Sequence, residues 1–269
     1  MNSMNYVCIQ GVPRSGTSWL GQIFKSAPSV AFRFQPLFSY AFKDRLGPDS
    51  SKVEIIAFFE DILQTDDRFV LQQDDAIHVD YPTFSDQGEV THLVMKEVRY
   101  NHILKNLIRV IPDLKVIGLV RDPRAVMDSW INAPREFKPE WNVQEQWRSG
   151  DLKNQGRVEE FFGFNKWKEV AQLFIDLEKE DPEQCKVVRY ADLNSDPLGT
   201  VRELFDFCDL TLTERTISFI EESRSKEGKD ANSIYRKTRP DTAWQERLPV
   251  NIADAILEEL EGTSLARFL

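Results

Sequence analysis

The chain has 269 residues, of which 41% are hydrophobic and 29% are charged, and its formal net charge is −10. This is the composition of an ordinary globular protein with a sizeable core, and the negative charge argues against general nucleic-acid binding. An anionic ligand would need a local basic cluster that works against this charge, so the positions of individual arginines are informative.

The cysteines and the N-terminal region bear on the compartment. Cys8, Cys185 and Cys208 have no paired spacing and stand in apolar contexts, so we expect reduced core residues rather than disulfides or metal ligands. No signal-peptide pattern is evident, and no apolar run approaches the ~20 residues of a membrane span. We expect a soluble, cytoplasmic protein without a membrane partner, unless an N-terminal anchor has been removed.

Apolar runs rich in β-branched residues alternate with stretches of helical periodicity, which is typical of an α/β fold. Near-continuous apolar runs predict strands buried on both faces of a parallel sheet, at residues 6–10, 92–96, 115–120 and 186–190. Helical spacing predicts helices near residues 20–27, 55–63, 164–174, 198–208 and 252–260. No linker divides the sequence, so we expect one domain over residues 1–269, a central parallel sheet flanked by helices.

The first predicted strand runs into GVPRSGTSWL, which has the form of a phosphate-binding loop. Gly11 and Gly16 keep the glycine spacing of the triphosphate loop G-x-x-x-x-G-K-[ST], but Thr17 replaces its lysine. Arg14 instead supplies a permanent charge from within the loop. Three hydroxyl groups add hydrogen-bond donors, those of Ser15, Thr17 and Ser18. Because such a turn gathers N–H groups at a helix start, we predict a phosphate or sulfate site; a plain turn with a solvated arginine is the structural alternative.

The second motif is VIGLVRDPRAVMDSW. Arg121 ends a predicted strand, and Asp122 and Pro123 suit the N-cap and first position of the following helix. Ser129 lies about two turns into that helix. Since ligands of open α/β sheets bind at the carboxyl ends of strands, Arg121 and Ser129 predict a second, separate anion site. The alternative is a structural arginine paired with Asp122 or Asp128.

Two anion sites at adjacent strand ends suit a nucleotide with a 5′-phosphoryl group and a ribose 3′-phosphate. PRSGTSW and LVRDPRAVMDSW together resemble the sulfotransferases that use 3′-phosphoadenosine 5′-phosphosulfate (PAPS) and release 3′-phosphoadenosine 5′-phosphate (PAP), and RDPRAV is most similar to their carbohydrate branch. VVRYADLNSDPLGTVRELFDFCDL and IYRKTRPDTAWQERLP resemble later family segments in the same order. The resemblance implies a P-loop-like sulfotransferase fold and in-line transfer of a sulfuryl group to an acceptor hydroxyl or amine. A carbohydrate acceptor is implied only by the similarity to the carbohydrate branch.

The resemblance also implies a donor site, residue by residue. The loop from Arg14 to Trp19 would hold the 5′-phosphosulfate, with Arg14 as the basic catalytic residue, and Arg121 with Ser129 would bind the 3′-phosphate. Tyr190, like Trp19, falls where the family places an aromatic near adenine. The implied nucleotide-binding residues are Arg14, Ser15, Gly16, Thr17, Ser18, Trp19, Arg121, Ser129, Tyr190, Arg236 and Lys237. No metal is required, because arginines and backbone dipoles would neutralise the charge.

The acceptor side is less defined. Val98 occupies the position of the cytosolic branch's histidine, and Gln35 stands where carbohydrate members often carry a glutamate; an amide cannot act as a base. Glu97 is the leading candidate for a catalytic base, and Lys96 beside it would stabilise the sulfuryl group; a surface charge cluster is the alternative. Reserve candidates are His78, His92 and Asp80.

The segment 132–156 is polar and interrupted by proline and glycine, so we expect a loop or lid near the acceptor, which would be a small molecule or a carbohydrate. Two other functions stay open. A P-loop kinase would need the absent lysine, whereas a non-catalytic nucleotide-binding module is favoured by Gln35 and by the missing histidine.

Overall fold

A computed structural model describes residues 4–73, 81–85, 88–228, 233–235, 237 and 240–269. Its centre is a five-stranded sheet in the order β2-β3-β1-β4-β5, in which every neighbouring pair is parallel. The strands are β1 (Asn5–Gln10), β2 (Val30–Phe34), β3 (His92–Lys96), β4 (Leu114–Val120) and β5 (Cys185–Arg189). The predicted α/β class with a central parallel sheet is confirmed.

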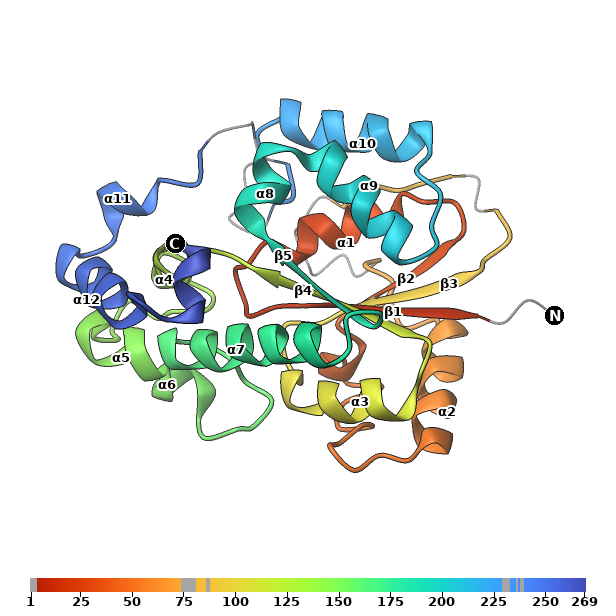
Figure 1. The fold of residues 1–269 in the computed structure, drawn as a ribbon, viewed down its shortest axis with the longest axis horizontal. Helices are drawn as coiled ribbons and strands as arrows, with labels where there is room; N and C mark the ends of the chain where they lie inside the picture. The colour runs from red at the N-terminus through yellow and green to blue at the C-terminus, as the bar shows by residue number, and fades with distance from the viewer. Residues whose placement is uncertain (1–3, 74–80, 86–87, 229–232, 236, 238–239) are drawn as a thin grey trace.

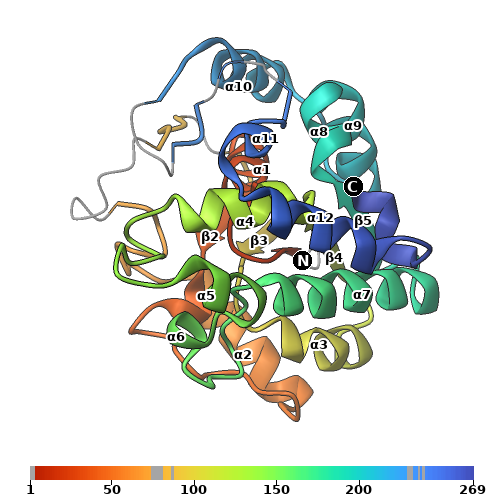
Figure 2. The same ribbon diagram turned by 90° about the vertical axis from the view of Figure 1, so that its left-hand side faces the viewer.

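Helices cover both faces of this sheet. Figure 1 shows α1, α8, α9 and α10 on one face and α2, α3 and α7 on the other, while α4, α5, α6, α11 and α12 gather toward the end where the strands finish, which faces the viewer in Figure 2. The helices are α1 (Thr17–Lys25), α2 (Lys52–Leu63), α3 (Leu104–Val110), α4 (Pro123–Ile131), α5 (Val143–Ser149), α6 (Asp151–Asn154), α7 (Phe164–Glu180), α8 (Tyr190–Ser195), α9 (Pro197–Phe207), α10 (Glu214–Ser225), α11 (Trp244–Arg247) and α12 (Val250–Leu260). Short 3₁₀ turns span Pro36–Phe38, Asn101–Ile103 and Ser264–Phe268.

The strands are apolar because both of their faces are covered. On β1, Val7 and Ile9 pack with the core under α1 and α9, whereas Cys8 between them faces the core under α2 and α7. All three cysteines are buried with free thiols, as predicted from their apolar contexts. Within the described residues, none of the helices has the length and apolarity needed to cross a membrane.

Two features differ from the sequence prediction. Strand β2 was not predicted, since Arg33 interrupts its apolar run; the buried guanidinium donates to the carbonyl oxygens of Ile62 and Leu63 and so caps the C-terminal end of α2. The segment 132–156, predicted as a loop, contains α5 and α6. Asn142 caps α5, and the Asn154 side chain exchanges hydrogen bonds with the backbone of Phe162, which fixes this polar stretch in helical form.

The topology places a crevice between β1 and β4. From β1 the chain passes through α1 toward β2 at one edge, whereas from β4 it passes through α4 toward β5 at the other edge. Where the connections of adjacent parallel strands part in this way, their carboxyl ends form the usual ligand crevice of an open α/β sheet.

Candidate functional site

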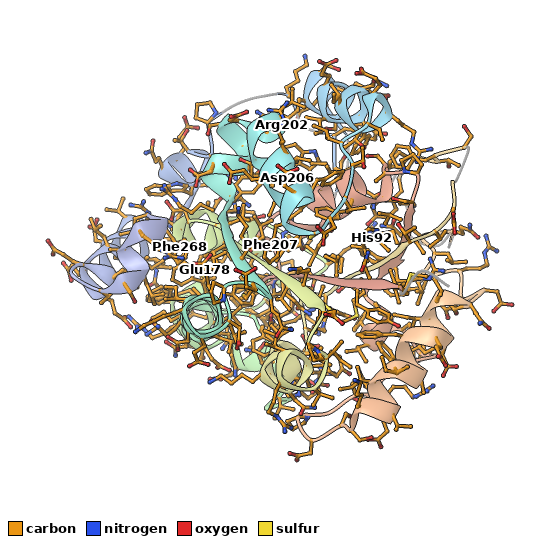
Figure 3. All side chains as sticks on the ribbon, turned by 45° about the vertical axis from the view of Figure 1, so that its right-hand side comes forward. His92, Glu178, Arg202, Asp206, Phe207 and Phe268 are labelled. Atoms are coloured by element: carbon orange, nitrogen blue, oxygen red, sulfur yellow. The ribbon has the colours of Figure 1, made fainter. Side chains whose placement is uncertain are left out.

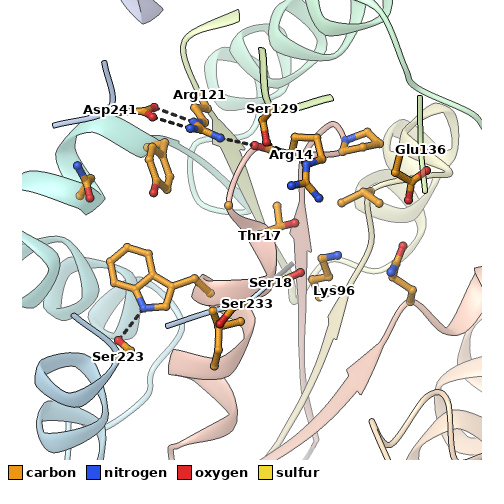
Figure 4. Close-up of a pocket in the computed structure, with 18 of the residues that line it drawn as sticks. Arg14, Thr17, Ser18, Lys96, Arg121, Ser129, Glu136, Ser223, Ser233 and Asp241 are labelled. Atoms are coloured by element: carbon orange, nitrogen blue, oxygen red, sulfur yellow. Dashed lines mark hydrogen bonds and ion pairs between the residues drawn. The ribbon is translucent and has the colours of Figure 1, made fainter. Parts of the chain in front are cut away.

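A cavity of about 410 Å³ opens at the carboxyl ends of the strands, and residues that follow each of the five strands line it (Figure 4). Its volume lies in the range of small-molecule sites. Among the described lining residues, eight are basic: Arg14, Lys96, Arg99, Arg121, Arg135, Arg224, Lys237 and Arg247. Because the whole chain carries −10, this lining is a local reversal of charge that suits an anionic ligand.

The β1–α1 loop is shaped by a glycine at a position that excludes any side chain. Gly16 has φ 93°, and a Cβ atom there would lie 2.6 Å from the Tyr190 ring. Arg14 also has a positive φ, 74°, and its Nε donates a 3.0 Å hydrogen bond to Ser129 Oγ. The two anion sites predicted as separate are therefore in direct contact.

Thr17 and Ser18 line the cavity at the start of α1, as expected of hydroxyl donors at a helix N-terminus. Ser15 does not. Its side chain is fully buried on the other side of the loop, near Trp167 and Phe174, and its Oγ has no hydrogen-bond partner. The structure therefore does not bring the predicted Ser15 hydroxyl to the site.

Arg121 lies where it was predicted, at the cavity wall after β4. Its Nη1 donates to the Arg14 carbonyl oxygen (2.9 Å), and its Nε and Nη2 donate to the Asp241 carboxylate (2.7 and 2.5 Å). The ion pair outweighs burial and raises the pKa of Arg121 above its usual value. The partners named in the structural alternative were wrong, because Asp122 pairs with Arg124 and Asp128 with Arg247.

Two aromatic side chains, which the family resemblance assigned to the adenine site, flank the loop. Trp19 lines the cavity and donates from Nε1 to Ser223 Oγ (2.9 Å), and Tyr190 lies under the Arg121 guanidinium at 5.0 Å from the ring centre. Lys237 lines the cavity, whereas Arg236 lies outside the described residues. The Arg224 guanidinium lies over the Trp19 ring, 5.3 Å from its centre, so each of the two rings has an arginine over it.

Lys96 and Glu97 are neighbours in sequence but have different surroundings. Lys96 lines the cavity, with Nζ 4.8 Å from the Phe34 ring centre, and burial lowers its pKa. Glu97 is fully buried and does not line the cavity; its Oε1 accepts from the Leu37 N–H (2.8 Å), and burial raises its pKa. The position of Glu97 therefore speaks against the predicted role as a base, and also against a surface charge cluster.

Of the three reserve candidates for the base, His92 lies within the described residues. His92 lies at the beginning of β3 (Figure 3) and does not line the cavity, and its Nε2 is 2.8 Å from the Cys208 carbonyl oxygen. His78 and Asp80 lie outside the described residues. Val98 and Gln35, which occupy the family's base positions, both line the cavity but offer no titratable group.

Sequence reasoning missed two carboxylates of the site. Asp241 and Glu136 are the carboxylates among the described lining residues, and they come from the C-terminal segment and from the stretch after α4. Glu136 pairs with Lys153 (2.5 Å). Nothing local distinguishes either residue in the sequence, since each reaches the site through a long-range arrangement of the chain. The described residues contain no cluster of His, Cys, Asp or Glu suited to a metal ion.

Several known sulfotransferases are similar to this chain in sequence or in fold. Human carbohydrate sulfotransferase 3 is 27% identical over 152 residues, which cover 54% of this chain and 31% of that protein. Mouse carbohydrate sulfotransferase 5 is 29% identical over 176 residues, 59% of this chain and 43% of that protein. The chain thus spans about a third to two fifths of the length of the curated relatives it matches.

Solved structures support the same fold. Mouse sulfotransferase SULT7A1, crystallised with PAP, superposes with a TM-score of 0.57 at 12% identity, covering 98% of this chain and 87% of that one. The sulfotransferase domain of the Synechococcus PCC 7002 olefin synthase gives 0.52 at 17% identity, with 95% and 94% covered. The model of the Sulfotransferase family itself matches residues 7–214, from the first strand past α9 and through most of the elements that build the cavity, and the chain therefore belongs to that family.

Proposed function

We propose that this chain is a PAPS-dependent sulfotransferase that transfers a sulfuryl group to an acceptor hydroxyl or amine by in-line displacement. The observation that carries the proposal is the basic cavity at the β1–β4 crevice, built around a phosphate-type loop whose lysine position holds Thr17. PAP, the ligand of the mouse sulfotransferase with the same fold, is the nucleotide we assign to this cavity.

The residues present fit the two anionic ends of such a nucleotide. Thr17, Ser18 and the N-terminus of α1 would bind the 5′-phosphosulfate, and Arg14 would add a charge there. Arg121 and Ser129 would bind the 3′-phosphate. Because Arg14 and Ser129 are joined by a hydrogen bond, the two ends of the site are mechanically linked.

When bound, PAPS would supply an activated sulfuryl group, and the protein would supply position and charge. Arg14 and the N-terminus of α1 would stabilise the charge that develops on the leaving 5′-phosphate. Lys96, which is almost fully buried at the cavity wall, would stabilise the sulfuryl group during its transfer to the acceptor. No residue of the described cluster requires a metal for these tasks.

The acceptor would need a base, and Glu136 is the residue we assign to that role. Of the two carboxylates on the described cavity wall, Asp241 is held on Arg121, whereas Glu136 lies on the opposite side of Arg14 (Figure 4). Its ion pair with Lys153 would orient the carboxylate toward the acceptor. A carbohydrate acceptor is proposed from the sequence relatives alone.

The test is a comparison of melting temperatures with PAP and with ATP plus Mg²⁺. At a hundred times its dissociation constant, PAP should add about 2.7 kcal/mol of stability, or about 5–10 °C for a domain of this size. Arg14→Ala should lose most of this shift, whereas Arg202→Ala, on the exposed face of α9, removes the same charge and should keep it. A shift with ATP and none with PAP would contradict the proposal and favour a kinase.

A nucleotide-binding module without turnover is the second candidate. It is favoured by the observation that Val98 and Gln35 form the cavity wall at the family's base positions. Such a module would bind PAP but would give no sulfated product with any acceptor in a screen of sugars, phenols and amines, whereas the enzyme would give one.

A further inference from the structure

The guanidinium of Arg121 already has an anionic partner within the chain. Asp241 accepts from both Nε and Nη2, so that carboxylate and guanidinium form a two-point contact of the kind that a phosphate also makes. The Arg121 and Asp241 side chains are 12% and 22% exposed, which leaves the pair only weakly screened by solvent. A ligand phosphate on Arg121 would therefore meet a carboxylate on the same cation.

Asp241 is held at this place by the chain around it. The segment 241–247 runs beside the end of β4 and along α4, and three of its residues each contact one residue there. Asp241 binds Arg121, Trp244 lies over Arg124 (4.2 Å from the guanidinium carbon to the ring centre), and Arg247 binds Asp128. Since two of the contacts do not involve Asp241, loss of its carboxylate would leave the segment attached to α4.

We propose that Asp241 is a specificity-determining residue, an internal carboxylate that competes with the 3′-phosphate of the nucleotide for Arg121. This inference rests on the proposed function of the cavity. A nucleotide without a 3′-phosphate leaves the Arg121–Asp241 pair intact and binds without this competition. A nucleotide with a 3′-phosphate gains Arg121 only by displacing Asp241. Asp241 thus lowers the affinity of the site for PAP and its preference for 3′-phosphorylated nucleotides.

The experiment measures binding of PAP and of 5′-AMP, which lacks the 3′-phosphate, by calorimetry. Asp241→Asn keeps the shape of the side chain and removes its charge. We expect the variant to bind PAP about tenfold more tightly and to bind 5′-AMP within twofold of the unchanged protein. The matched control is Glu246→Gln, which removes one negative charge from the exposed face of the neighbouring helix α11 and should change neither affinity.

A second comparison separates competition at Arg121 from a general field effect. In an Arg121→Gln background, Asp241→Asn should no longer strengthen PAP binding. The inference is overturned if Asp241→Asn leaves PAP affinity unchanged or weakens it, or if 5′-AMP or Glu246→Gln shows the same gain. If the unchanged protein fails to bind PAP at all, the proposed function itself is wrong, and this result is distinct from an unchanged affinity in the variant.

Discussion

Ser15 and Thr17 stand two residues apart in one loop, yet their side chains have opposite environments. Thr17 lines the cavity, whereas the Ser15 hydroxyl is buried among apolar side chains without a partner. A buried, unsatisfied hydroxyl costs about 1–3 kcal/mol, so the loop carries Ser15 at a cost in stability. The sequence analysis predicted both residues as hydrogen-bond donors to the ligand. It could not distinguish them, because a loop pattern does not reveal which way each side chain points.

The paired variants Ser15→Ala and Thr17→Ala should therefore behave differently. Ser15→Ala should leave PAP affinity within twofold and raise the free energy of unfolding by about 1 kcal/mol, since it removes the unsatisfied group. Thr17→Ala should weaken PAP binding about 5- to 10-fold, since it removes a donor at the helix start. Urea unfolding and calorimetry measure the two effects. A loss of PAP affinity in Ser15→Ala would contradict the observed orientation.

Glu97→Gln tests the corrected assignment of the base. Because the Glu97 carboxyl lies outside the cavity, the variant should retain turnover within a few-fold, whereas Glu136→Gln should lose about 10²-fold or more, with PAP affinity unchanged in both. The assay uses the first acceptor that gives product in a screen. A large loss of turnover in Glu97→Gln alone would restore the sequence-based assignment.

The same variant should change the pH dependence of stability. The pKa of Glu97 is raised in the folded protein above its ordinary value of 4.5, so the unfolded chain releases this proton first. The wild type should lose stability, relative to Glu97→Gln, as the pH rises from about 4.5 toward the raised pKa. Urea unfolding at pH 5 and pH 8 measures this difference, and parallel curves would show that Glu97 is ionised in both states.

At the level of elements, strongly apolar segments were predictable and weakly patterned ones were not. β1, β3, β4 and β5 lie within one residue of their predicted bounds, since each contributes apolar residues to the cores on both faces of the sheet. β2 was missed because Arg33, a cation, interrupts it, and its use as a helix cap depends on the position of α2. α5 and α6 were missed because their stability comes from contacts with residues beyond the segment, above all those of Asn154.

Asn154→Ala tests this account of the segment 132–156. The Asn154 side chain donates to the Phe162 carbonyl oxygen (2.8 Å) and accepts from its N–H (3.0 Å), and both groups are buried. Removal of the side chain leaves two buried backbone groups unsatisfied, so the free energy of unfolding should fall by about 2–4 kcal/mol. Gln155→Ala, at the exposed next position, is the control and should change stability by less than about 0.5 kcal/mol. Similar urea midpoints for the two variants would refute the role of Asn154.

At the level of the whole molecule, the fold class and the location of the site were predictable, whereas the pairing of distant charges was not. Arg14 after β1 and Arg121 and Ser129 after β4 lie at the carboxyl edge of the sheet, as the order of motifs predicted, but they form one site and not two. Asp241 lies 120 residues from Arg121 in sequence, and only the folded chain brings them together. The expectation of a cytoplasmic protein stays a prediction.

The basic cavity contains one group, Lys96, whose titration should make PAP binding sensitive to pH. Burial, together with Arg99 and Arg14, lowers the pKa of Lys96, and a bound anion would raise it again. Lys96 should therefore take up a proton as PAP binds, so PAP affinity should fall as the pH rises above the lowered pKa, by at most about tenfold per pH unit. Calorimetry in buffers of different ionisation enthalpy measures the proton uptake. Lys96→Met should flatten the profile, and an unchanged slope in that variant would assign the proton to another group.

The place of β1 in the sheet has a consequence for how the chain is made. β1 lies between β3 and β4, so its register partners begin only at His92 and Leu114. At a synthesis rate of about 5–20 residues per second, the strand that carries the phosphate loop emerges several seconds before either neighbour exists. During that interval its apolar residues and unpaired backbone groups are open to other chains, which is a route to aggregation. Yield of folded protein should therefore depend on chaperones that bind extended apolar segments, and slower expression at low temperature should favour the native sheet.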